Sequence, residues 1–202
     1  MYAIAVSRGQ LSVHTLLLAG VIINAVCSAL MMFATSIVNP SALYRVVLWL
    51  MGTLSAPSRT ALIGVAACVV VGLLWLLRYS HALNLLVTGE EASRSLGVES
   101  NHVQRMVFVV SALLTGVVVS LCGMIGFVGM VVPHLVRIVC GADHRLLLPV
   151  SALAGGMLLI LADTVARTVV APAEIPVGVV TALIGGPFFL YLLITRRYRF
   201  ST

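Results

Sequence analysis

Charged residues divide this chain into long apolar segments. Runs free of Asp, Glu, Lys and Arg cover residues 9–44, 60–77, 106–136, 146–162 and 175–195. Each run approaches or exceeds the roughly 20 residues that an α-helix needs to cross a bilayer. The pattern therefore predicts an all-α, polytopic membrane protein.

Composition supports this class. The chain of 202 residues is 61% hydrophobic and 9% charged, with a mean hydropathy of +1.15. A soluble domain of this size must keep a large polar surface, and this chain has too few polar residues to supply one. The first apolar stretch is too long for a cleavable signal peptide, so none is expected.

The longest run must contain a break. Residues 106–136 would form a continuous helix of about 46 Å, well beyond a hydrocarbon core of about 30 Å. Gly123, Gly126, Gly129 and Pro133 interrupt it. We expect one span to end near residue 122 and a shorter one to begin near residue 126.

Residues 41–54 are apolar but too short to span, and Pro40 and Pro57 bound them. A short re-entrant or interfacial helix is expected there. Full spans are then predicted at residues 13–35, 59–78, 103–122, 126–140, 146–168 and 177–195.

The arginines orient these six spans, and they supply all twelve basic residues because the sequence contains no lysine. One side of the membrane receives Arg8, Arg78, Arg94, Arg105, Arg137, Arg145, Arg196, Arg197 and Arg199. The other side receives Arg45, Arg59 and Arg167. The positive-inside rule makes the first side cytoplasmic, so both termini of this chain are expected inside. The net charge of +6 follows from topology, and nucleic-acid binding is not expected.

The longest cytoplasmic connection, residues 79–102, contains "TGEEASRSLGV". Thr88 and Glu91 have the spacing of a capping box, and Gly97 is placed to end a helix of about two turns. We name residues 88–97 the connecting turn. A helix this short is marginal in water, so it must be held either by its own spans or by a soluble partner.

Four segments together resemble one known family. They are "TGEEASRSLGV", "GFVGMVVPHLVRIVCGADHRLLLPVSALAGG", "LADTVAR" and "EIPVGVVTALIGGPFFLYLL". In this order they are similar to the FecCD-type permeases of ABC importers, which carry iron-siderophore chelates, haem and cobalamin. The likeness runs from "LSVHTLLLAGV" to Leu193.

The resemblance implies a single permease domain over residues 1–202, with the loop 79–102 engaging the transporter's ATPase. The implied partners are ABC ATPase subunits, a periplasmic or lipid-anchored substrate-binding protein, a second permease subunit and the lipid bilayer of a bacterial inner membrane. Family members usually have ten spans, so the six spans here correspond to the fifth to tenth. We expect the N-terminal spans to be missing from this sequence.

The resemblance also implies roles for particular residues. The residues expected to couple to the ATPase are Thr88, Gly89, Glu90, Glu91, Ala92, Arg94, Leu96 and Gly97. Arg167 and Glu174 are expected to dock the binding protein, although Arg167 also lies one helical turn from Asp163 and can simply neutralise it. The family's gate loop falls at Ser12, Val13 and His14. Related permeases often have small polar residues there, and Val13 and His14 are bulkier.

The chain is not expected to be an enzyme. A P-loop needs a lysine, so ATP hydrolysis belongs to a separate subunit. The zinc-protease and serine-hydrolase patterns HExxH and GxSxG are also missing from the sequence. No cofactor or metal is expected, because the four cysteines lack CxxC spacing and the five histidines include no pair at i, i+4.

Two alternatives stay open at this point. A zinc or manganese ABC permease would need clustered histidines, and a secondary transporter would need several ionisable groups at mid-membrane. The sequence itself does not identify the chelate.

Overall fold

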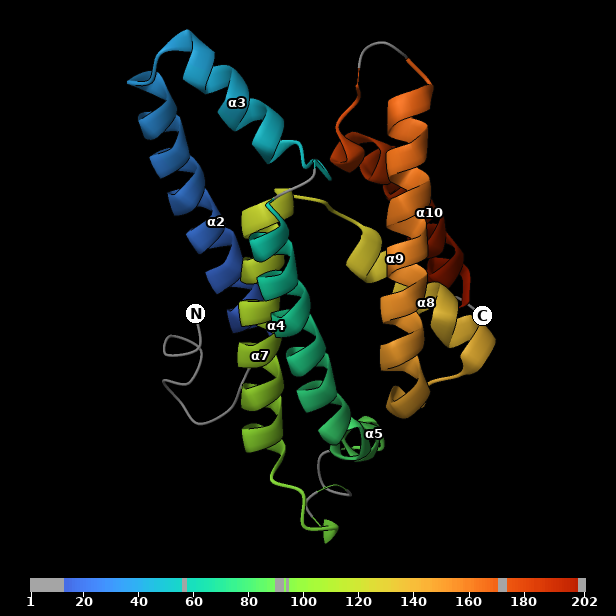
Figure 1. Cartoon of the computed structure of the whole chain (residues 1–202). Helices are drawn as coiled ribbons and strands as arrows, with labels where there is room; N and C mark the ends of the chain where they lie inside the picture. Colours follow the sequence, from blue (N-terminus) through green and yellow to red (C-terminus); the bar gives the residue numbers. More distant parts are fainter. Residues whose placement is uncertain (1–12, 56–57, 90–92, 94, 171–173, 200–202) are drawn as a thin grey trace. The chain divides into compact units, whose positions relative to one another are not determined.

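The structure is a computed structural model that describes residues 13–55, 58–89, 93, 95–170 and 174–199. Every regular element in these residues is a helix (Figure 1), so the all-α expectation is confirmed. The helices are α2 (Val13–Ser36), α3 (Pro40–Leu50), α4 (Arg59–Arg78), α5 (Ser80–Val87), α7 (Ser100–Cys122), α8 (Val128–Cys140), α9 (His144–Thr168) and α10 (Val177–Arg199).

A helix lies at the place of each predicted span. Among the described residues, four helices are long and apolar enough to cross a membrane, at Leu17–Ser36, Arg59–Arg78, Ser100–Cys122 and His144–Thr168. Val128–Cys140 and Val177–Leu192 are apolar but shorter. The length and apolar character of these helices identify the chain as a membrane protein. The count of six spans stays a prediction.

The chain divides into two compact units, residues 1–47 and 48–202. In the first unit, α2 carries apolar side chains that are largely exposed, such as Leu17 (63%), Met32 (73%) and Phe33 (68%). Such side chains need lipid or protein around them. The expectation of one permease domain over the whole chain stays a prediction.

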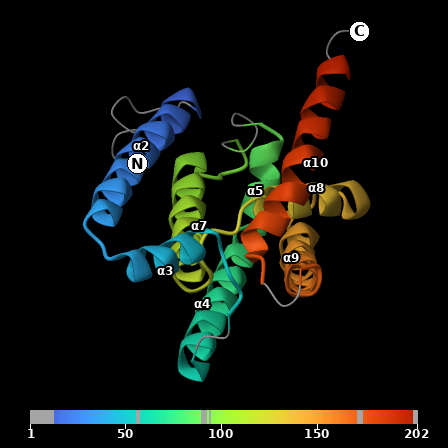
Figure 2. The same cartoon turned by 90° about the horizontal axis from the view of Figure 1, so that it is seen from above.

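Within the second unit, α4 and α7 lie side by side (Figures 1 and 2). Gly72 allows this approach, because a Cβ there would meet the side chain of Leu114. Small residues commonly let membrane helices come this close.

The other long helices of this unit gather around α9. Val132 and Val136 of α8 pack with Leu147 of α9 in one buried cluster. Ala162 and Ala166 of α9 pack with α10 in another, at Val177 and Val180. Helix α9 is therefore the common neighbour of α8 and α10.

The predicted break in the long apolar run is confirmed. Helix α7 ends at Cys122, Gly123 has a φ of +71°, and α8 begins at Val128. Pro133 was expected to mark this break, but it lies inside α8. Gly123 caps the end of α7, whereas Gly129, like Pro133, lies inside α8.

The predicted short helix is also present, as α3. It begins at Pro40, where the missing N–H costs nothing in a first turn. The last turn of α3 and the residue after it lie against glycines at the end of α7 and the start of α10. A Cβ at Gly123 would collide with the Trp49 carbonyl oxygen, and one at Gly178 would collide with that of Met51.

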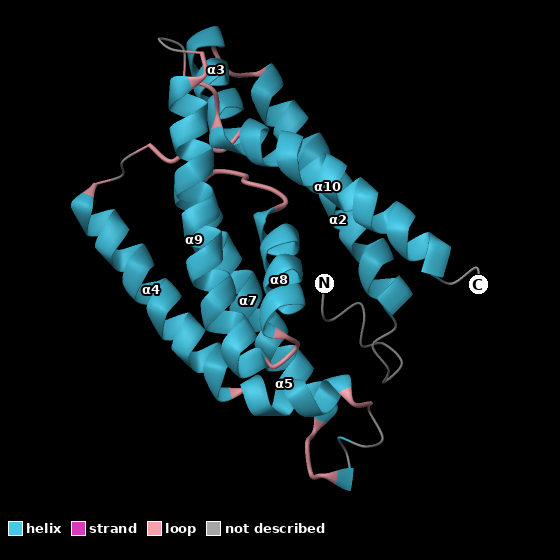
Figure 3. Ribbon diagram, turned by 90° about the vertical axis from the view of Figure 1, so that its right-hand side faces the viewer, coloured by secondary structure: helices cyan, strands magenta, loops and turns pink. Residues whose placement is uncertain are grey.

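Helix α5 was not predicted. Residues 80–87 were assigned to the cytoplasmic connection, but they form a helix beside the end of α4 and the start of α9 (Figure 3). Eight residues cannot cross a bilayer, so the length of the apolar runs does not indicate this helix. Apolar positions at Ala82, Leu83, Leu85 and Leu86 have helical spacing and could have revealed it.

Candidate functional site

The connecting turn begins directly where α5 ends. Thr88 has helical φ and ψ, and its hydroxyl donates to the Leu85 carbonyl oxygen at 2.6 Å. The Gly89 carbonyl oxygen accepts the Ser93 N–H at 3.0 Å. Thr88 therefore terminates α5, and the expectation that it opens the next helix as a capping residue is wrong. The physical reason is the unpredicted helix before it.

Gly97 ends the connecting turn in the way that the sequence predicted. Its φ is +79°, and the Val98 N–H donates to the Ser93 carbonyl oxygen at 3.0 Å. This six-to-one hydrogen bond after a left-handed residue is the Schellman motif. Open space surrounds the position of a Gly97 Cβ. The glycine is required by its backbone conformation and not by crowding.

A buried polar contact holds the connecting turn to the protein. Ser93 is 0% exposed and Ser100, in the first turn of α7, is 2% exposed. Their hydroxyl oxygens lie 3.1 Å apart. Since a buried hydroxyl without a partner costs about 1 to 3 kcal/mol, this pair fixes the turn against the start of α7. Sequence analysis missed both serines, which no local pattern distinguishes.

The end of the connecting turn is accessible. Leu96 is 64% exposed, and a shallow hollow lies beside it between Gly97 and Asn101. An exposed leucine on an anchored turn can enter a pocket of another protein. Glu90, Glu91, Ala92 and Arg94, the other residues expected to couple to the ATPase, lie outside the described residues.

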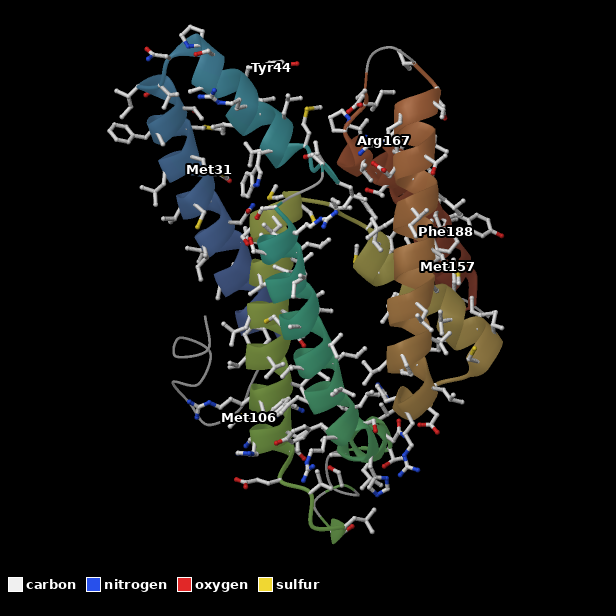
Figure 4. All side chains as sticks on the ribbon, viewed as in Figure 1. Met31, Tyr44, Met106, Met157, Arg167 and Phe188 are labelled. Carbon is white, nitrogen blue, oxygen red and sulfur yellow. The ribbon has the colours of Figure 1, made fainter. Side chains whose placement is uncertain are left out.

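Arg167 and Asp163 form the expected pair near the far end of α9. The Arg167 Nε donates to the Asp163 carboxylate at 2.9 Å. Arg167 also lies 3.7 Å from the Glu174 carboxylate, and its Nη2 donates to the Leu54 carbonyl oxygen at 3.4 Å. The structure thus brings both predicted docking residues together. Figure 4 places Arg167 at the end of α9 that is remote from α5.

These contacts agree with a role of Arg167 in neutralising Asp163. They are also compatible with docking of a binding protein. The Arg167 side chain is 45% exposed and that of Glu174 is 72% exposed. Both remain accessible to another protein.

The expected gate residues are described only in part. Ser12 lies outside the described residues, and Val13 and His14 are the first residues of helix α2. Their assignment as a gate stays a prediction.

Two of the histidines, His134 and His144, contact side chains of other helices. The ring of His134 meets the edge of the Phe188 ring at 6.5 Å between centroids. His144 contacts Asn84 through its backbone N–H and its ring Nδ1. Within the described residues, no three His, Cys, Asp or Glu side chains gather as a metal site would require.

An apolar groove of about 610 Å³ lies between α4, α7 and α9. Val69, Leu114, Val118 and Leu159 are among the residues that line it. Its wall offers few polar groups to recognise a small ligand, so it is better suited to apolar surface.

The fold and the motifs define a helical membrane transport protein. Residues 1–195 match the FecCD transport family. The chain belongs to this family.

Individual relatives are similar along nearly all of this chain. The cobalamin import system permease protein BtuC of Halobacterium salinarum is 46% identical over 98% of this chain and 53% of its own length. The hemin transport system permease protein HmuU of Yersinia pestis is 43% identical over 94% of this chain and 57% of its own. The chain therefore spans about half the length of the curated relatives it matches.

A solved structure shares the fold. It is described as a metal-chelate-type ABC transporter in an inward-facing conformation, with a TM-score of 0.84 and 35% sequence identity. The match covers 91% of this chain and 60% of the other.

Proposed function

We propose that this chain forms the C-terminal part of a permease subunit in an ABC importer for large chelates such as cobalamin or haem. The observation that carries the proposal is the connecting turn, which the buried Ser93–Ser100 pair anchors while its Leu96 side chain is exposed. Such a turn can pass force from a soluble partner to the membrane helices. Membership of the FecCD family supports this interpretation.

The partner at the connecting turn is a separate ATPase, which hydrolyses the ATP. When two ATPase subunits close, they move the turn, and the helices tilt to open the path alternately to each side. A second permease subunit forms the other half of this path. Because the permease itself performs no covalent chemistry, its contribution is the mechanical link between these sites.

The protein lies in the inner, cytoplasmic membrane with α5 and the connecting turn on the cytoplasmic side. The arginine distribution supports this orientation, since nine of twelve fall on that side. Arg167 and Glu174 then face outward, where a substrate-binding protein docks on them. Both termini of this chain are cytoplasmic.

The substrate class follows from the relatives. The two named above are permeases for cobalamin and hemin, which favours a chelate over the zinc or manganese alternative. The apolar lining of the helices supports a path that does not itself select a small ion.

Uptake by the complete subunit tests this function. The subunit is placed in proteoliposomes with its ATPase and binding protein, and cobalamin, haem and a ferric siderophore are each supplied outside. We expect ATP-dependent uptake of at least one chelate, and none when the ATPase lacks its catalytic carboxylate. Uptake of free zinc or manganese alone, or uptake driven by a proton gradient without ATP, would contradict the proposal.

A further inference from the structure

A hydrogen-bonded cluster joins α5 to the beginning of α9. Asn84 and His81 lie one turn apart on α5, and they contact Asp143, His144 and Arg145, about 60 positions later in the sequence. None of these five residues belongs to the connecting turn or contacts Arg167. We name the five together the α5–α9 clasp.

Asn84 lies at the centre of the clasp. Its Nδ2 donates to the Asp143 carboxylate at 2.6 Å. Its Oδ1 accepts from the His144 backbone N–H at 2.9 Å and from the His144 ring Nδ1 at 2.7 Å. An amide oxygen only accepts, so the His144 ring carries its proton on Nδ1. One orientation of the amide satisfies all three contacts.

The clasp includes the N-terminal cap of α9. Asp143 is the N-terminal capping residue of α9, and its carboxylate accepts the Arg145 N–H at 3.0 Å. That hydrogen bond, with the one from Asn84, holds the pKa of the Asp143 carboxyl below its usual range. The carboxylate is therefore charged at neutral pH and also faces the positive end of the helix dipole.

A second contact runs parallel to the first. The Arg145 Nη2 lies 3.2 Å from the His81 Nδ1. A guanidinium only donates, so His81 accepts here and carries its proton on the other ring nitrogen. Two side chains on one face of α5 thus hold two successive positions of α9, which opposes both sliding and rotation of one helix against the other.

The clasp lies on a continuous route through the second unit. The connecting turn is hydrogen-bonded to the end of α5 through Gly89, and α5 is joined to α9 by the clasp. Helix α9 then runs for 25 residues, about 37 Å, to the end that carries Arg167. By contrast, α7 is joined to the turn directly through Ser93 and Ser100.

We propose that Asn84 is a positioning residue that makes α9 follow the connecting turn, so that the ATPase moves α7 and α9 through two separate links. This inference rests on the proposed function, because it requires a partner that moves the turn. Without the clasp, the ATPase would still bind and would still move α7. Motion of α9, and with it the opening of the path, would be lost.

An exchange of charge within the clasp tests the proposal in the complete transporter. Asn84→Asp replaces the donor with a second carboxylate facing Asp143. Asp143→Asn keeps an acceptor oxygen for Arg145 and removes the charge. The double variant again pairs one amide with one carboxylate. Gln104→Glu is the matched control, because it adds the same charge to an exposed amide position near the start of α7.

We expect Asn84→Asp to lower chelate uptake per ATP hydrolysed about tenfold, a typical strength of coupling between sites. The ATPase should still co-purify and hydrolyse ATP. The double variant should return uptake to the level of Asp143→Asn alone, and Gln104→Glu should match the wild type.

Three outcomes would overturn the inference. The first is an unchanged chelate uptake per ATP hydrolysed in Asn84→Asp. The second is a loss of this uptake that the double variant Asn84→Asp with Asp143→Asn does not recover. If Asn84→Asp does not insert stably, Asn84→Ala replaces it, since it removes all three contacts of the amide without adding a charge, and full coupling there would be the third. Failure of the proposed function is a separate result, because the wild-type transporter itself would then show no bound ATPase or no ATP-dependent uptake.

Discussion

Single residues set the properties of the connecting turn. Gly97 provides the left-handed conformation that ends it, and Ser93 provides the buried hydroxyl that anchors it. The two requirements differ in kind. Gly97 has open space around it, so a larger residue is resisted by backbone strain, whereas Ser93 is enclosed and is held by its hydrogen bond with Ser100.

Gly97→Val should therefore impair coupling. A β-branched residue resists a positive φ, at a cost of about 1 to 2 kcal/mol. We expect chelate uptake to fall and the ATPase to be released or to hydrolyse ATP without transport. Membrane insertion and capture of the binding protein should be normal.

Gly97→Asn is the matched control, since asparagine tolerates the left-handed conformation. It should retain most of the uptake that valine loses. Full uptake and retained ATPase in Gly97→Val would mean that the end of this turn does not contribute to coupling.

At the scale of elements, α9 has a distinct polar group at each end. The end near α5 is held by the clasp, and the other end carries the Arg167–Asp163 pair. Between them its apolar side chains pack on α8 and α10 in two separate buried clusters. The polar contacts therefore fix both ends of α9, and the apolar clusters fix its middle.

Arg167→Glu should weaken capture of the substrate-binding protein. The reversed charge would repel acidic residues on that protein, more strongly at low salt, because exposed charges are screened beyond about 10 Å at 0.1 M salt. The measurement is binding of the purified binding protein to the complete subunit in nanodiscs at two salt concentrations.

Two control variants separate docking from neutralisation. Arg167→Lys keeps the charge and should keep most of the binding. The double variant Arg167→Gln with Asp163→Asn leaves no carboxylate unpaired in the helix. It should still lose the salt-dependent part of the affinity for the substrate-binding protein. If this double variant binds normally, Arg167 serves only to neutralise Asp163.

At the scale of the whole molecule, much of the apolar surface is exposed. Val139 is 83% exposed and Ile160 is 69% exposed. Lipid can cover such surfaces, and so can the part of the relatives that this chain does not include, since it spans only about half of their length. We therefore place transport in the complete subunit and test it there.

The ends of α4 provide a test of orientation. Arg59 and Arg78 are exposed and begin and end one helix of 20 residues, about 30 Å long, which matches the hydrocarbon core. In a background without cysteines, Arg59→Cys should react with a membrane-impermeant thiol reagent added to intact cells, and Arg78→Cys should react only after lysis.

The reverse pattern would overturn the orientation and, with it, the proposal that the connecting turn meets a cytoplasmic ATPase. Labelling of both positions from outside would show that α4 does not span the membrane. Either result would be obtained without any assay of transport.

Apart from α5, the sequence by itself determined where the described helices lie. Run length against bilayer thickness located the long apolar helices. Glycine and proline located the break after Cys122, the start of α3 at Pro40 and the end of the connecting turn at Gly97. These are local properties, since backbone conformation and hydrophobicity are encoded within a few neighbouring residues. Distinctive motifs likewise indicated the family, because several long segments rarely match those of one family in the same order by chance.

Only the tertiary structure decided which residues meet. Ser93 with Ser100, Asn84 with Asp143 and Gly123 with the Trp49 carbonyl are contacts between helices or their ends. Serine, asparagine and glycine occur at many positions with no such role, and the contacts of each depend on how two helices pack. The error at Thr88 has the same origin, because its role depended on the packed helix α5 before it.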